Sequence, residues 1–94
     1  MTGVNDSDAD TILRGILRDV LGLDQQRTDA LTADSGLFGS LPELDSMAVA
    51  GLLTEMEDRL DIVIDDDEVD GELLENYGNL LDFARSKRAA AQGA

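Results

Sequence analysis

Apolar residues recur every three or four positions in three separate segments of this 94-residue chain, and this spacing constrains its fold more than any other feature. Residues at such spacing share one face of an α-helix, which can pack against other helices. The pattern predicts helices from residue 7 or 8 to 21, from 45 or 46 to 60, and from about 79 to 91, with a short helix around 68–75. The predicted fold class is therefore all-α: a small four-helix bundle, three main helices plus one short helix, with a long loop over residues 22–45.

Residues that start or stop helices flank these segments. Ser7 is suited to cap the first helix, and Gly22 is suited to end it. We expect one domain over residues 7–91, a flexible N-terminal tail over residues 1–6 and a flexible C-terminal tail over residues 92–94. Apolar residues scattered through the long loop should anchor it to the core; they are Leu31, Leu37, Phe38, Leu41 and Leu44.

The chain is strongly acidic: 7 Lys and Arg against 21 Asp and Glu give a formal net charge of −14. Nucleic acid and anionic membranes would repel such a chain, whereas basic surfaces on other proteins would attract it. The chain has no Cys and no His, which excludes disulfides, thiolate nucleophiles and the commonest general base near neutral pH. A domain this small also leaves little room for an enclosed active site. No segment is long and apolar enough to span a membrane and the N-terminus is unlike a signal peptide, so we expect a cytoplasmic protein, and a monomer by default.

The stretch from Leu41 to Met47, Leu-Pro-Glu-Leu-Asp-Ser-Met, leads into the second main helix. A helix N-terminus presents unpaired N–H groups and a partial positive charge, which suit a phosphodiester. Ser46 would place a hydroxyl in that field, and Asp45 could cap the helix. Because Ser and Asp cap helices in many proteins, this pair by itself indicates only a cap, and the functional interpretation depends on the longer pattern.

That longer pattern resembles the acyl and peptidyl carrier proteins, whose attachment site is Asp-Ser followed by Leu or Met, after a long loop and at the start of the second helix. Residues 57–68 resemble the acidic end of that family's second helix, and residues 77–80 resemble the approach to its last helix. The resemblance covers residues 8–88, nearly the whole chain.

The resemblance implies a non-catalytic carrier that holds acyl groups as thioesters on 4′-phosphopantetheine attached to Ser46. It implies that Asp45 helps to position magnesium and the modifying enzyme, and that partner enzymes grip Met47. The implied partners are a phosphopantetheinyl transferase, a ligase or acyltransferase that loads the thiol, and a downstream synthase or transferase. No metal site of the chain's own is implied.

Two further sets of residues are candidates for binding. The second main helix should present one exposed face to partners, formed by Met47, Gly51, Thr54, Glu55 and Asp58. The resemblance also implies a lining for the acyl chain, although packing explains these residues equally well: Leu52, Met56, Leu60, Ile62 and Phe83.

The sequence departs from the family pattern at two positions. The family usually has glycine three residues before the attachment serine, where this chain has Glu43; this departure bears on which transferase recognises the site. Arg59 lies within a cluster that is commonly all acidic in the family, which implies that the partner enzymes binding this patch differ from the usual fatty-acid set.

Other interpretations stay open. The chain could be a discrete peptidyl (aminoacyl) carrier, or an acidic helical interaction protein without a prosthetic group. The segment Asp61–Glu72 has the length and end residues of a calcium-binding EF-hand loop, but Val63 and Asp66 occupy the positions of a ligand and of the turn glycine. Catalysis by its paired carboxylates is disfavoured because they are abundant and expected to be exposed.

Overall fold

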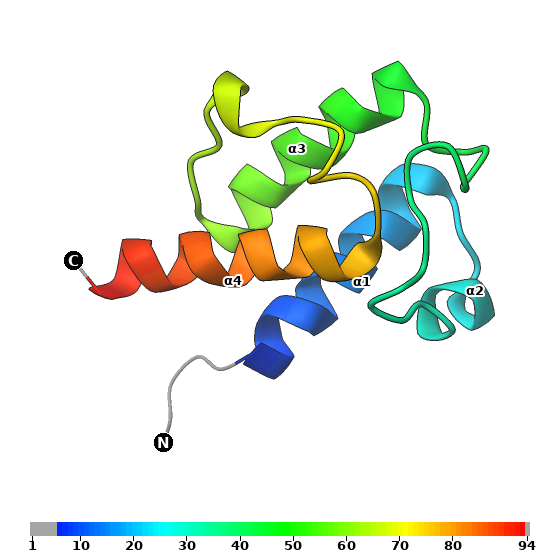
Figure 1. Ribbon diagram of the computed structural model, residues 1–94. Coiled ribbons are helices and arrows are strands. Elements are labelled where there is room, and N and C mark those ends of the chain that lie inside the picture. Colours follow the sequence, from blue (N-terminus) through cyan, green and yellow to red (C-terminus); the bar gives the residue numbers. More distant parts are fainter. Residues whose placement is uncertain (1–5, 94) are drawn as a thin grey trace.

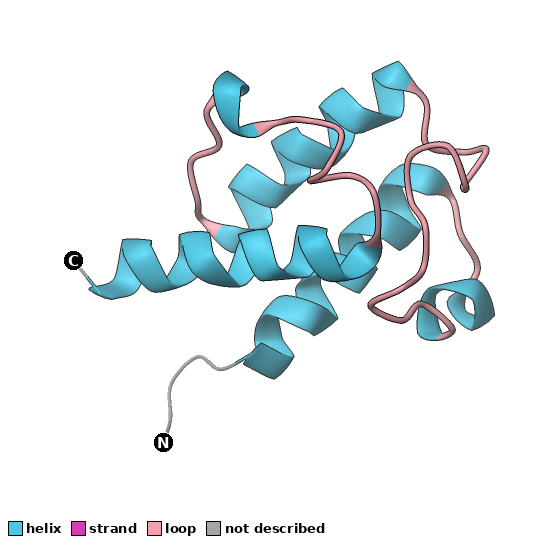
Figure 2. Cartoon of the chain, viewed as in Figure 1, coloured by secondary structure: helices cyan, strands magenta, loops and turns pink. Residues whose placement is uncertain are grey.

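The computed structural model describes residues 6–93 of the chain, with side chains over residues 9–90. Four α-helices and one 3-10 turn follow one another, drawn as helix and loop alone in Figure 2. They are α1 (Asp6–Leu21), α2 (Gln25–Asp29), α3 (Ser46–Leu60), the 3-10 turn η1 (Asp66–Glu68) and α4 (Tyr77–Gly93). The predicted all-α class is confirmed.

The three main helices match the predicted segments closely. α1 ends where expected, because Gly22 takes a left-handed conformation with φ of 72°. It begins at Asp6, so Ser7 lies inside its first turn and does not precede it as a cap. Residues 1–5 and 94 of the expected tails lie outside the described part of the chain, and the division into tails and domain stays a prediction.

The short helix is elsewhere than predicted. The prediction of a helix at residues 68–75 is wrong. The 3-10 turn η1 ends at Glu68, and residues 71–75 form turns. The fourth α-helix is α2, inside the connection that was expected to lack regular structure. The side chain of Asp24 starts α2 by accepting the Arg27 N–H at 2.7 Å, and Thr28 is buried.

Helix α1 is the central element of the bundle, because it contacts α2, α3 and α4 (Figure 1). The core is almost entirely aliphatic; its fully buried members include Leu13, Ile16, Leu17, Leu52, Met56 and Leu80. Of the five loop residues expected to anchor the connection, three are buried: Leu31, Leu37 and Leu44. Leu41 is half-buried, whereas Phe38 is 52% exposed, so it does not anchor the loop in the way expected.

Backbone hydrogen bonds fasten the long connection to the segment that leads into α4. Leu37 and Phe38 donate to the carbonyls of Glu75 and Leu74 at 3.2 and 2.9 Å. In the opposite direction, the N–H of Tyr77 donates to the Ser35 carbonyl at 2.8 Å, and the N–H of Gly78 donates to the Ala33 carbonyl at 3.0 Å. A Cβ atom at Gly78 would lie 3.0 Å from the Ala33 side chain, so a glycine allows this close approach. We call this pairing of residues 33–38 with residues 74–78 the loop clamp.

A polar network ties α1 to both α2 and α4. The Arg14 guanidinium donates to the carbonyls of Thr28 and Leu31 at 2.8 and 2.9 Å and to the Asp10 carboxylate at 2.9 Å. The buried Tyr77 hydroxyl donates to the same carboxylate at 2.6 Å. Burial, together with the neighbouring Asp10 carboxylate, raises the pKa of Tyr77 above its ordinary value, so the hydroxyl keeps its proton and stays a donor. None of the helices in residues 6–93 has the length and apolar character needed to cross a lipid bilayer.

This network generates a stability prediction. Tyr77→Phe removes the hydroxyl that bonds to Asp10 without changing the shape of the ring, so the free energy of unfolding should fall by about 1–2 kcal/mol. Urea unfolding followed by circular dichroism measures the change. An unaltered free energy of unfolding would show that this hydrogen bond contributes nothing to holding α4 on α1.

Candidate functional site

The first turn of α3 combines an exposed hydroxyl with a helix N-terminus. Ser46 is the first residue of the helix and is exposed. Asp45 precedes it with extended backbone, φ −101° and ψ −175°, and its side chain accepts the Ala48 N–H at 2.8 Å. The first N–H groups of a helix have no acceptor within the helix and give that end a partial positive charge. Ser46 therefore lies in the positive field that the sequence predicted, with Asp45 as the N-cap.

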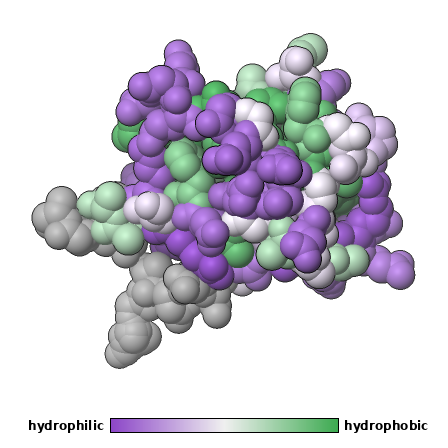
Figure 3. Space-filling model, viewed as in Figure 1, coloured by the Kyte–Doolittle hydropathy of each residue, from purple (hydrophilic) through white to green (hydrophobic). Residues whose placement is uncertain are grey.

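An apolar groove opens next to Ser46. It has a volume of about 360 Å³ and is lined by Phe38, Ser46, Val49, Val69, Asp70, Gly71 and Leu74. The loop clamp forms one wall, since the N–H of Phe38 is bonded to the carbonyl of Leu74. Hydrophobic residues are visible toward the upper right of Figure 3, where α3 begins in Figure 1, while hydrophilic residues cover much of the remaining face.

Apart from Ser46, none of these groove residues was expected at the site. Phe38 was assigned to anchoring the loop, Val69 lies in an acidic tract, and Leu74 lies in a segment predicted as helix. Sequence spacing could not place Val69 and Leu74 beside Ser46 because they are remote from it along the chain. The one local signal was a large aromatic residue flanked by turn residues, including Gly39, which adopts φ of 91°.

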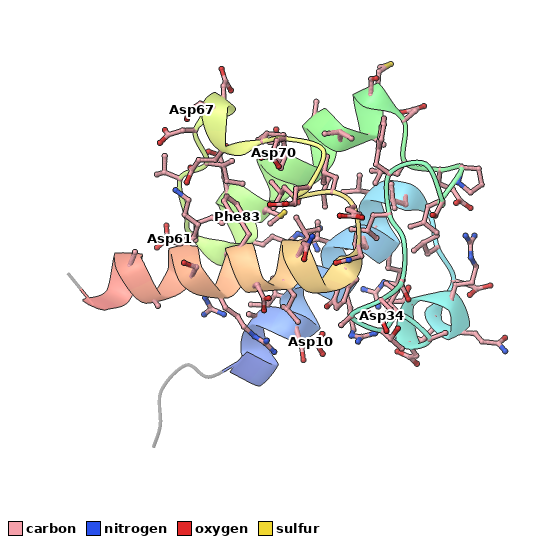
Figure 4. The ribbon with its side chains drawn as sticks, viewed as in Figure 1. Asp10, Asp34, Asp61, Asp67, Asp70 and Phe83 are labelled. Atoms are coloured by element: carbon pink, nitrogen blue, oxygen red, sulfur yellow. The ribbon has the colours of Figure 1, made fainter. Side chains whose placement is uncertain are left out.

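The residues expected to line an acyl chain lie deeper or elsewhere. Four of them belong to the closed core, where the most exposed is only 5% accessible: Leu52, Met56, Leu60 and Ile62. Phe83, labelled in Figure 4, is half-buried and borders a different hollow, together with Asp70 and other carboxylates. The structure thus places the first four in the core along α3 and just past its end, and Phe83 does not line the apolar groove.

The expected partner face of α3 is present but uneven. Met47 is 84% exposed, and Thr54 and Asp58 are exposed. Gly51 and Glu55 are half-buried. The departure at residue 59 has a visible consequence, since Arg59 donates to the Glu55 carboxylate at 2.9 Å.

The departure at residue 43 is also explained by an ion pair. The Arg27 guanidinium of α2 donates two hydrogen bonds to the Glu43 carboxylate, at 2.6 and 3.2 Å. The hydrogen bonds from Arg27, aided by a backbone N–H, lower the pKa of Glu43 below its ordinary value. These two hydrogen bonds connect α2 to the loop at a point three residues before Ser46.

Carboxylates in the segment of the candidate EF-hand loop bind backbone groups. Asp70 accepts the Leu73 N–H, and Glu68 accepts the Asp65 N–H while pairing with Lys87 at 2.7 Å. Within the described residues, no group of three or more acidic side chains is arranged to hold a metal ion. The segment lacks the convergent oxygens that a calcium loop needs.

Capping by Asp45 can be separated from its charge. Asp45→Ala should lower the free energy of unfolding by about 1 kcal/mol because the Ala48 N–H loses its acceptor. Asp45→Asn keeps a side-chain oxygen that can cap and should unfold close to the wild type in urea. Equal losses in both variants would show that charge, and not capping, stabilises the start of α3.

The Arg27–Glu43 pair predicts a pH dependence. Because the folded-state pKa of Glu43 is lowered, its contribution to stability is present at neutral pH and is lost as the pH falls through that lowered value. Arg27→Gln should raise the pKa of Glu43 toward its ordinary value, as measured by NMR titration of the carboxyl carbon, whereas Arg27→Lys should raise it less. A pKa that does not change in Arg27→Gln would contradict the pairing.

Comparison with known proteins gives one family and one structural relative. A protein-family model described as the phosphopantetheine attachment site matches residues 11–85. The solution NMR structure of a holo acyl carrier protein from Nitrosomonas europaea is 43% identical to this chain, with a TM-score of 0.75. That similarity covers 84% of this chain and 93% of the other. A search of curated proteins gives no match.

The described site fits the group that this family carries. An exposed hydroxyl in the positive field of a helix suits a phosphate ester, and the adjoining groove suits apolar cargo. The family match extends over most of the chain, and the structural relative shares both sequence and fold with it. The chain therefore belongs to the acyl carrier proteins, non-catalytic shuttles that hold acyl groups on covalently attached 4′-phosphopantetheine.

Proposed function

We propose that Ser46 is the residue to which the phosphopantetheine arm is attached. The observation that carries the proposal is the position of its hydroxyl: exposed, in the first residue of α3, at the mouth of the apolar groove. When bound, the arm supplies the thiol that this cysteine-free chain lacks and that holds the acyl group as a thioester. The N–H groups of the first turn would then stabilise the phosphate oxygens.

We assign two roles to Asp45. Its side chain caps α3 through Ala48, which holds Ser46 at the start of a regular helix. Its carboxylate is exposed and belongs to the residue directly before Ser46, and it would also help the modifying enzyme to position magnesium. The ion pair between Arg27 and Glu43 ties α2 to the loop that leads to Ser46.

The apolar groove is our candidate for the entrance taken by the acyl chain. Val49 lines the groove, and Leu52 and Met56 continue from it along the inner face of α3 into the core. An acyl chain entering beside Phe38 would therefore meet the buried residues expected to line it once the core parts. Phe83 borders the other hollow, and its part in such a lining stays a prediction.

The family implies binding to a phosphopantetheinyl transferase and to biosynthetic enzymes. We propose that a ligase or acyltransferase loads the arm and that a downstream synthase or transferase removes the acyl group. These enzymes would dock on the exposed face of α3 around Met47. The net charge of −14 would draw basic enzyme surfaces and repel nucleic acid and anionic membranes. A cytoplasmic location and a monomeric state stay predictions.

The test is co-expression with a broad-specificity phosphopantetheinyl transferase, followed by intact-mass measurement. The wild type should gain one phosphopantetheine, and Ser46→Ala should gain none. Ser86→Ala, at an exposed serine of α4, is the matched control and should be modified like the wild type. Modification of Ser46→Ala would move the attachment to another residue, and an unmodified wild type would favour an acidic interaction protein without a prosthetic group.

A further inference from the structure

One patch of paired charges lies where the second half of α3 meets α1. Arg59 bridges two carboxylates: its Nε lies 2.9 Å from Glu55 on the same helix, and its Nη1 lies 2.9 Å from Asp19 on α1. Asp19 is also 3.3 Å from Arg18. We call these four residues the paired cluster; its two positive and two negative charges sum to zero.

Both carboxylates of the paired cluster form ion pairs with arginines: Glu55 with Arg59, and Asp19 with Arg59 and Arg18. The hydrogen bonds from Arg59 and then Arg18 lower the pKa of Asp19, so Asp19 stays ionised and bonded at neutral pH. A basic group on another protein would have to displace Arg59 before it could bind Glu55 or Asp19. Such a displacement exchanges one exposed ion pair for another and gains little.

Asp58 differs from Glu55 although both lie on the exposed face of α3. It is exposed, and no ion pair involves it among the described side chains. The first two turns of the same face are uncharged, with exposed Met47, Ala50 and Thr54 around Gly51. The Thr54 hydroxyl donates to the Ala50 carbonyl at 2.9 Å, so it is already bonded within the helix. The face thus offers one large apolar side chain and one unpaired carboxylate.

We propose that Arg59 masks Glu55 and Asp19 from partner enzymes, so that the enzyme surface fitting α3 has an apolar pocket for Met47 and a cation opposite Asp58, but none opposite Glu55. This inference rests on the proposed docking of enzymes on α3 and specifies the surface they present. Arg59 acts as a specificity-determining residue because it decides which carboxylates of the face a basic partner can reach.

Two variants with the same net charge test the proposal. Glu55→Gln and Asp58→Asn each remove one carboxylate from α3, so long-range attraction falls equally in both. With the broad-specificity transferase as probe, kcat/KM for modification of Ser46 should stay within about twofold in Glu55→Gln. It should fall about three- to tenfold in Asp58→Asn at low salt, with the difference shrinking as salt rises.

Removing the Arg59 guanidinium should have the opposite effect on kcat/KM. Arg59→Gln should raise kcat/KM severalfold at low salt, and the gain should disappear when Asp19→Asn and Glu55→Gln are added. Lys87→Gln on α4 makes the same change in net charge as Arg59→Gln, by removing a cation paired with Glu68, and should not reproduce the gain beyond about twofold. Urea unfolding of each variant confirms that the fold is retained.

The outcomes separate this inference from the attachment site. Equal losses in Glu55→Gln and Asp58→Asn, or no gain in Arg59→Gln, would overturn the masking of Glu55 while Ser46 is still modified. Modification of Ser46→Ala by the transferase would overturn the proposed attachment residue instead.

Discussion

The loop clamp is the interaction on which the rest of the site depends. The connection between α2 and α3 contains no helix or strand, and although it buries three leucines, the Phe38 side chain is exposed. Four backbone hydrogen bonds to residues 74–78 supply that path. Because the same pairing sets Phe38 against Leu74, it also builds one wall of the groove beside Ser46. Fold and candidate site therefore share one set of bonds.

Acidic side chains have a structural use in this molecule beyond giving it charge. Asp24 and Asp45 start helices, Asp70 and Glu68 satisfy N–H groups in the turns before α4, and Glu57 accepts the Ile64 N–H. A small helical domain has many helix ends and turns relative to its core, and each leaves backbone donors to satisfy. The surplus of carboxylates is thus partly the means by which short segments keep their shape.

Three of the few basic side chains connect separate segments of the chain. Arg14 connects α1 to α2 and to Tyr77, Arg27 restrains the loop before Ser46, and Arg59 pairs with Glu55 of α3 and Asp19 of α1. Each bridges segments far apart in sequence. In a chain of net charge −14, the placement of an arginine decides which carboxylates remain available to partners.

Prediction from sequence succeeded where the physical cause is local. α3 and its Asp45 cap follow from apolar spacing and a capping side chain within a few residues of each other, and so does the exposure of Ser46. It failed for α2, whose five residues carry no apolar stripe and are held by a guanidinium from α1. It failed also for residues 68–75, where turns, one of them closed by a side-chain cap, replace the expected helix.

Local order along the chain was enough to define three helices, an acidic surface and a serine at a helix start, because periodicity, capping and charge act between near neighbours. The groove, the loop clamp and the paired cluster required the folded molecule, because each joins residues separated by dozens of positions. Such contacts depend on how helices pack against one another, and many packings are compatible with the same apolar stripes.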